Sequence, residues 1–106
     1  METSAPVFAA LGDETRLRLV ARLCEDGPQS ITKLTLGQNL TRQAITKHLH
    51  VLADAGLVAG VRRGREEIWE LQPQHLEVAR RYLELVSTRW DEVLERLRFS
   101  VETDSQ

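Results

Sequence analysis

The sequence predicts a mainly helical protein with one small β-hairpin, and three observations support this fold class. Apolar residues recur at helical spacing in several segments of the chain. Two of these segments, 31–36 and 42–55, are separated by a short turn that contains Gly37. Two runs of β-preferring residues then flank an Arg-Gly-Arg sequence. The whole chain, residues 1–106, has the length of a single domain.

The N-terminal quarter is expected to form two helices. Val7 to Leu11 is a short apolar segment that Gly12 interrupts, and Asp13 is a suitable N-cap for the next helix. In that second helix an apolar stripe recurs at i, i+3, i+4 and i+7, formed by Leu17, Val20, Ala21 and Cys24. We expect this stripe, Cys24 included, to be buried. Gly27 and Pro28 end the helix.

Residues 30–55 predict a helix-turn-helix motif. Ser30 is placed to cap a short helix, Ile31 to Leu36, and Thr41 is placed to cap a longer helix that runs to about Ala55. Gly37 supplies a turn position that tolerates a positive φ. The buried stripe of the longer helix is expected to be Ala44, Ile45, Leu49 and Leu52.

A β-hairpin is expected over residues 57–71. Leu57 to Val61 and Glu66 to Leu71 have the composition of strands, and Arg62-Arg63-Gly64-Arg65 forms the tip. A hairpin directly after the second helix of the motif is a wing, so the predicted fold is a winged helix-turn-helix.

The final helix is expected to run from Pro73 to about Ser100 and to form a dimer interface. Its apolar residues keep an alternating spacing of three and four: Leu76, Ala79, Leu83, Val86, Trp90, Val93 and Leu97. At ~1.5 Å per residue this helix is about 40 Å long, more than the width of a small domain. It either packs on its own domain or pairs with a second copy. Its length and heptad regularity favour a homodimer, joined by the segment around Val7, Phe8 and Leu11.

The charge distribution indicates a nucleic-acid partner, although the net charge of −2 by itself does not. Between Ser30 and Arg65 there are six basic residues and one acidic residue, Asp54. A basic middle between acidic flanks is typical of a domain that presents one face to phosphates.

The single cysteine excludes an intrachain disulfide. Without a membrane span, or a signal peptide within Met1 to Pro6, we expect a cytoplasmic location.

The longer helix of the motif carries the main candidate contacts to double-stranded DNA. Five polar side chains share the face opposite its buried stripe: Arg42, Gln43, Thr46, Lys47 and His50. Arginine and glutamine form paired hydrogen bonds with guanine and adenine, respectively, and the other three suit phosphate or mixed contacts. The alternative is a solvated helix face, but such a face commonly mixes Glu with Lys, and this one has no Glu.

Two further groups are candidate contacts to the DNA backbone. One is the wing set Arg62, Arg63 and Arg65, which either reaches a phosphate or minor groove or pairs with Glu66, Glu67 and Glu70 across the strands. The other is Ser30, Thr32 and Lys33, at a helix start that offers backbone N–H groups to a phosphate. For Ser30, capping is an alternative that is compatible with this role.

The sequence gives little support for catalysis or metal binding. It has no glycine-rich phosphate loop, and His48 and His50 point to different faces of their helix. His75 near Glu77 is weak evidence for a metal site. We therefore expect no enzymatic activity, no cofactor and no metal, and interpret His48 as a structural, hydrogen-bonded histidine.

Three stretches resemble the ArsR family of bacterial winged-helix repressors. They are FAALGDETRLRLVARL (8–23), LTRQAITKHLHVLADAGLV (40–58) and the Arg-Gly-Arg wing. The tail RWDEVLERLRFSVE (89–102) looks like that of a subgroup with a long final helix and no assigned metal site. The resemblance implies dimerisation through the first and last helices, and DNA reading by Thr41, Arg42, Gln43, Thr46, Lys47 and His50. Many relatives repress their own promoters and release DNA when a metal or another signal binds.

The chain departs from the metal-sensing relatives, because residues 30–36 contain no cysteine and the final helix has only His75 with nearby acids. The leading hypothesis is a sequence-specific repressor that acts as a homodimer on a palindromic site. A winged-helix protein-interaction module and a metal-responsive repressor are the alternatives. A small-molecule or protein effector remains open. The arginine-rich surface favours DNA, since a protein-binding face would expose apolar anchors.

Overall fold

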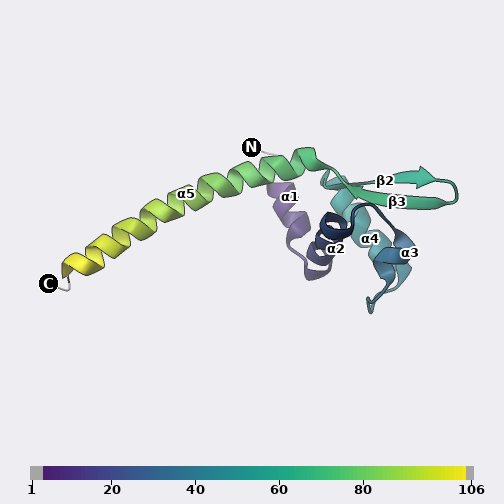
Figure 1. Ribbon diagram of the computed structural model, residues 1–106, viewed down its shortest axis with the longest axis horizontal. Coiled ribbons are helices and arrows are strands. Elements are labelled where there is room, and N and C mark those ends of the chain that lie inside the picture. The colour runs from purple at the N-terminus through teal and green to yellow at the C-terminus, as the bar shows by residue number, and fades with distance from the viewer. Residues whose placement is uncertain (1–3, 105–106) are drawn as a thin grey trace.

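The computed structural model describes residues 4–104 and confirms the winged helix-turn-helix architecture (Figure 1). The first three and last two residues of the predicted 1–106 domain lie outside the described part. In chain order the elements are α1 (Ser4–Leu11), α2 (Glu14–Asp26), β1 (Gln29–Ser30), α3 (Ile31–Thr35), α4 (Arg42–Asp54), β2 (Val58–Arg63), β3 (Glu66–Leu71) and α5 (Pro73–Asp104).

Helices α2, α3 and α4 begin at the three predicted N-caps. The Asp13 carboxylate accepts from the backbone N–H of Arg16 at 3.1 Å, and the hydroxyls of Ser30 and Thr41 accept from the equivalent N–H of α3 and α4. Each cap satisfies a donor that has no partner within the helix. The bond from Arg16 is also the main reason that the pKa of Asp13 lies below its ordinary value.

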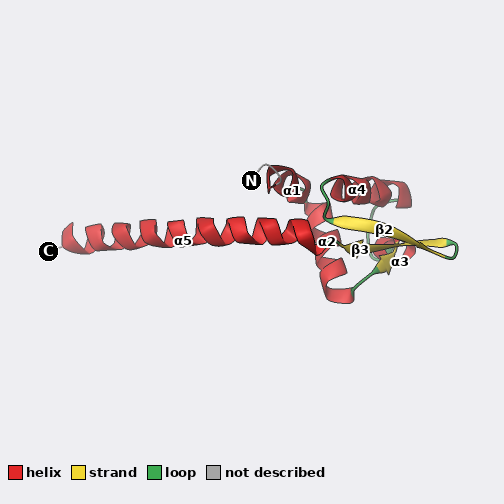
Figure 2. Cartoon of the chain, turned by 90° about the horizontal axis from the view of Figure 1, so that it is seen from above, coloured by secondary structure: helices red, strands yellow, loops and turns green. Residues whose placement is uncertain are grey.

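The wing belongs to a three-stranded antiparallel sheet with the order β1-β3-β2. β2 and β3 pair from Val58↔Leu71 to Arg63↔Glu66, and this hairpin extends away from the helices (Figure 2). β1 adds the pair Ser30↔Ile68 on the other edge of β3. The sequence does not predict β1, because a two-residue strand has no alternating pattern of its own. Its pairing ties the start of α3 to the wing.

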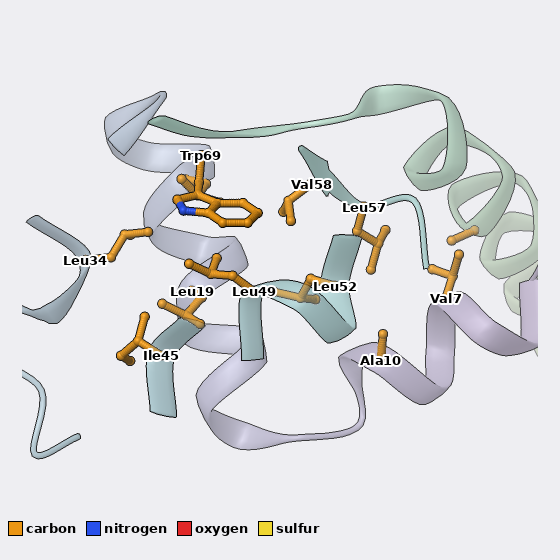
Figure 3. Close-up of a cluster of buried hydrophobic side chains, with 12 residues drawn as sticks. Val7, Ala10, Leu19, Leu34, Ile45, Leu49, Leu52, Leu57, Val58 and Trp69 are labelled. Carbon is orange, nitrogen blue, oxygen red and sulfur yellow. The ribbon is translucent and has the colours of Figure 1, made fainter. Parts of the chain in front are cut away.

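Among the described residues, the core is formed by side chains of all five helices and of the sheet, and Trp69 is its one aromatic ring (Figure 3). Ile45, Leu49 and Leu52 are fully buried, as their spacing predicted, whereas Ala44 is only half-buried. One face of α4 is thus committed to the core, which leaves its other face to solvent.

The predicted buried stripe of α2 is wrong. Leu19 and Leu23 face the core, whereas Leu17 is 52% exposed and Cys24 is exposed. The apolar residues of α2 fit two adjacent helical stripes, and tertiary packing selects the one flanked by Arg16 and Arg22. Those two long side chains reach backbone carbonyls of neighbouring helices, so their polar ends are satisfied at the edge of the core.

These arginines join the helices around the motif. The Arg22 guanidinium donates to the carbonyls of Lys33, Leu34 and Leu36 at 2.7, 2.9 and 3.2 Å, which satisfies the C-terminal end of α3. Arg16 donates to the Ala10 carbonyl of α1 and, from Nη1, to His48 Nδ1 of α4 at 3.2 Å. His48 is therefore the hydrogen-bonded structural histidine that was predicted.

α5 is longer than predicted and only its first turns pack on the protomer. Ala79 is buried against α1, and the rings of Phe8 and Tyr82 lie 5.7 Å apart. The rest of the helix projects from the body of the protein (Figure 1). With this helix included, the protein measures 69 × 29 × 20 Å. Among the described residues, no helix is both apolar and long enough to traverse a bilayer.

Candidate nucleic-acid interface

The five polar residues predicted on α4 lie together on one open surface. Arg42, Gln43, Thr46, Lys47 and His50 line a shallow concavity of about 600 Å³ on the side of α4 that faces away from the core. Four of them are exposed. Thr46 is half-buried, and its hydroxyl donates to the Arg42 carbonyl at 2.7 Å. The structure thus brings the predicted recognition residues into one continuous polar surface.

Neighbouring elements hold two of these side chains in place. Arg42 Nη1 donates to Thr32 Oγ1 at 3.1 Å, which joins the start of α4 to α3. The ring of His50 lies 5.9 Å from that of Trp69, so it packs over the buried tryptophan of β3. The guanidinium and the imidazole are therefore oriented before any ligand arrives.

The three candidates at the start of α3 separate into two kinds. Thr32 and Lys33 are exposed beside Arg42. Ser30 is only 7% exposed and its hydroxyl is occupied as the N-cap of α3. Of its two predicted roles, the structure places Ser30 in the capping role, which leaves Thr32 and Lys33 as the accessible side chains.

The wing arginines present free charges. Arg62 and Arg63 lie directly opposite Glu67 and Glu66 in the hairpin, yet within residues 4–104 no carboxylate comes within 4 Å of either guanidinium or of Arg65. All three arginines are exposed. The cross-strand ion pairs considered as the alternative are therefore not formed, and the wing tip is available to an anionic ligand.

The residues predicted at the dimer interface fall into three groups. Val7 and Ala79 are 0% and 4% exposed and belong to the protomer's own core, because α1 packs on α5 there, so neither has surface to offer a partner. Phe8, Leu11, Leu76, Val86 and Val93 are half-buried. Leu83, Trp90 and Leu97 are 54%, 59% and 56% exposed. The uncovered apolar surface of α5 therefore begins at about Leu83 and continues along the projecting part of the helix.

Sequence reasoning missed the supporting roles of Arg16 and Arg22. The local signal is two basic residues beside the true buried stripe of α2, and a solvated helix face gives the same signal.

The described residues contain no candidate metal site, since no three His, Cys, Asp or Glu side chains among them form a cluster suited to a metal ion.

Comparison with known proteins identifies the family. A helix-turn-helix domain model matches residues 11–61. The chain is 41% identical over 68 residues to the uncharacterized HTH-type transcriptional regulator YuzN of Bacillus subtilis (strain 168), a match that covers 58% of this chain and 74% of that protein. It is 38% identical to an ArsR-like transcriptional regulator from Rhodococcus sp. RHA1, with a TM-score of 0.72 over 91% of this chain and 90% of that one.

A third relative shares the fold at lower identity. It is a solution structure from Mycobacterium bovis described as a homodimeric winged helix-turn-helix DNA-binding domain, 24% identical with a TM-score of 0.65, covering 90% of this chain and 84% of that one. The fold, the exposed cationic face of α4 and the two relatives above 30% identity agree. The chain belongs to the ArsR family of helix-turn-helix transcriptional regulators, which are DNA-binding proteins and not enzymes.

Proposed function

We propose that the protein is a cytoplasmic repressor that binds a palindromic DNA site as a homodimer. In this proposal residues 1–106 form one domain, with the helix-turn-helix over 30–55, the wing over 57–71 and the dimerisation helix over 73–100. The observation that carries it is the combination, in one chain, of an acid-free polar face on α4 with an uncovered apolar seam on α5. The homodimeric relative from Mycobacterium bovis supports it.

The seam of α5 is self-complementary about the point between Val86 and Ser87. Antiparallel pairing of two copies places Leu83 opposite Trp90 and brings Leu97 of one copy to the level of Leu76 of the other. The Leu76 residues of the two copies are then 21 positions apart along the pair, or about 32 Å at ~1.5 Å per residue. This separation of the two protomer bodies is of the order of one DNA turn, about 34 Å, as a two-fold site requires.

Each recognition face then meets its own major groove. Arg42 and Gln43, at the N-terminal end of α4, are placed to read base edges, and Lys47 is placed to contact a phosphate. The wing arginines approach the backbone or the adjacent minor groove. All five residues of the α4 concavity are polar, which favours DNA over a protein partner, because a protein interface would bury apolar anchors.

Replacing Lys47 with alanine is expected to weaken binding to every DNA sequence by a similar factor. Loss of one phosphate contact per subunit should flatten the slope of log affinity against log salt by about 0.9 per contact, or about 1.8 for the dimer. Fluorescence anisotropy at four salt concentrations measures the slope, with Lys47→Arg as the charge-preserving control. An unchanged slope would remove the phosphate role of Lys47.

Selection of bound sequences from random duplexes, using the purified full-length protein, tests the proposal as a whole. We expect enrichment of a palindrome whose half-sites are centred about 10 base pairs apart. Placement of that palindrome between a promoter and a reporter gene should lower expression when the protein is present. Absence of any enriched sequence, or enrichment of an asymmetric one, would contradict the proposal, and raised expression would contradict repression.

A further inference from the structure

A groove lies behind the recognition helix, between α1 and the C-terminal end of α4. It has a volume of about 300 Å³ and is lined by Pro6, Ala9, Ala10, Val51, Asp54 and Ala55. The walls are small and apolar except for one carboxylate, and Val51 is 41% exposed. Small side chains on α1 allow another helix to approach closely.

The carboxylate in this groove lacks a counter-charge. Asp54 is the last residue of α4, where the negative end of the helix dipole disfavours an acid. The last turn of α4 contains no basic residue, and within residues 4–104 no cation lies within 4 Å of Asp54. The groove is therefore suited to an occupant that is apolar along its length and carries a cation.

The second half of α5 has that chemistry. Trp90, Leu94 and Leu97 are each more than half exposed, and α5 packs mainly on α1 through its first turns. Arg96 flanks the stripe formed by Val93 and Leu97, and it has no ion-pair partner among the described residues. Figure 1 shows this tail projecting away from the rest of the described protomer.

The register of the proposed homodimer brings the two features together. Antiparallel pairing about the point between Val86 and Ser87 carries the partner's Val93–Leu97 segment to the level of residues 76–80, which include Ala79. Ala79 is already covered by α1, so the arriving tail meets the outer face of α1, where Pro6 and Ala9 are exposed. The groove adjoins this face, and α1 and α4 lie on one side of α5 while the C-terminal end of α2 lies on the other (Figure 2).

We propose that the groove between α1 and α4 receives the tail of the partner's α5, with Leu97 against Val51 and Arg96 beside Asp54. The site is complete only when the second copy contributes these residues, and the inference rests on the proposed homodimer. Each recognition helix is then supported from behind by the other subunit. The orientation of α4 for DNA therefore depends on the tail as well as on the seam.

Disulfide trapping between two differently tagged protomers tests this contact. One protomer carries Cys24→Ser and Val51→Cys, and the other carries Cys24→Ser with Val93→Cys, Leu97→Cys or Val101→Cys in turn. The control replaces the first protomer with the wild-type chain, whose exposed Cys24 lies at the far end of α2. We expect at least one tail position to cross-link to Val51→Cys about tenfold faster than to Cys24, because a disulfide needs Cα atoms within about 7 Å.

The outcomes of this experiment test the tail contact in the groove and the homodimer separately. Cross-linking at the control rate, in chains that sediment as dimers, overturns the docking and leaves the homodimer intact. Chains that sediment as monomers overturn both. Selective cross-linking between the differently tagged chains supports both.

A charge exchange provides a second readout without cysteines. Arg96→Glu should raise the dimer dissociation constant about two- to tenfold, as expected for two partly exposed ion pairs, and adding Asp54→Arg should restore it. Arg98→Glu is the matched control, since Arg98 lies on the same tail beside Glu95 of its own helix. Equal effects of the two single substitutions, or no rescue by Asp54→Arg, would overturn the pairing of Arg96 with Asp54.

Discussion

Replacing Trp90 with alanine is expected to raise the dimer dissociation constant about a thousandfold. The side chain is 59% exposed in the protomer and lies at the middle of the α5 seam, where it pairs with Leu83 of the other copy in the proposed dimer. A buried tryptophan at an interface centre contributes ~2 kcal/mol or more, and the two-fold axis counts the loss twice. About 4 kcal/mol corresponds to a factor of about a thousand. Sedimentation across a range of protein concentrations measures it.

Thr88→Ala is the matched control, because Thr88 is exposed on the side of α5 away from the seam. It should leave both the dimer and DNA binding unchanged. DNA affinity of the Trp90 variant should fall at low protein concentration and recover as the concentration rises, because dimerisation and binding are linked. A Trp90 variant that stays dimeric at nanomolar concentration would refute the seam as the dimer contact.

Replacing Arg42 with alanine is expected to cost about 1–3 kcal/mol on the selected DNA site, which is about 5- to 150-fold in affinity. Arg42 is exposed at the N-terminal end of α4 and is held toward Thr32 at 3.1 Å, so its guanidinium is oriented before it meets a guanine. Because the contact reads one base, specificity at that position should relax while other positions keep theirs. Affinities for a set of single-base variants of the site measure this effect.

Arg18→Ala removes the same charge from an exposed position on α2, where Arg18 pairs with Glu14, and serves as the control. It should lower affinity little and equally for all sequences. If the Arg42 variant loses affinity equally for every DNA sequence, Arg42 contacts a phosphate and does not read a base. Thr32→Val should have a smaller effect than Arg42→Ala, since it removes only the partner that orients the guanidinium.

The elements that local sequence predicted well are those whose signals lie within a few residues. Asp13, Ser30 and Thr41 cap their helices because a short polar side chain reaches an N–H group two or three positions on. The stripe on α4 was correct for Ile45, Leu49 and Leu52, because the five polar residues of the opposite face offer no second apolar solution. The five side chains on the α4 concavity follow from the same helical geometry.

Contacts across long stretches of chain could not be predicted in this way. The pairing of β1 with β3 joins residues about forty positions apart, and Arg22 caps α3 from another helix. In α2 two apolar stripes compete, and the packing of α4 and β3 decides between them, which exposes Cys24. The burial of Ser30, which leaves its hydroxyl to the cap, depends equally on the pairing of β1 with β3.

The sequence by itself therefore determined the winged helix-turn-helix fold, the acid-free polar face of α4 and the heptad seam of α5, because helical periodicity, capping and turn chemistry act over a few residues. Tertiary structure alone decided which face of α2 is buried. It also decided that, among the described residues, the wing arginines have no carboxylate within 4 Å and Asp54, in the groove behind α4, has no cation within 4 Å. Those outcomes depend on which surfaces meet when distant segments pack, and no local pattern encodes that choice.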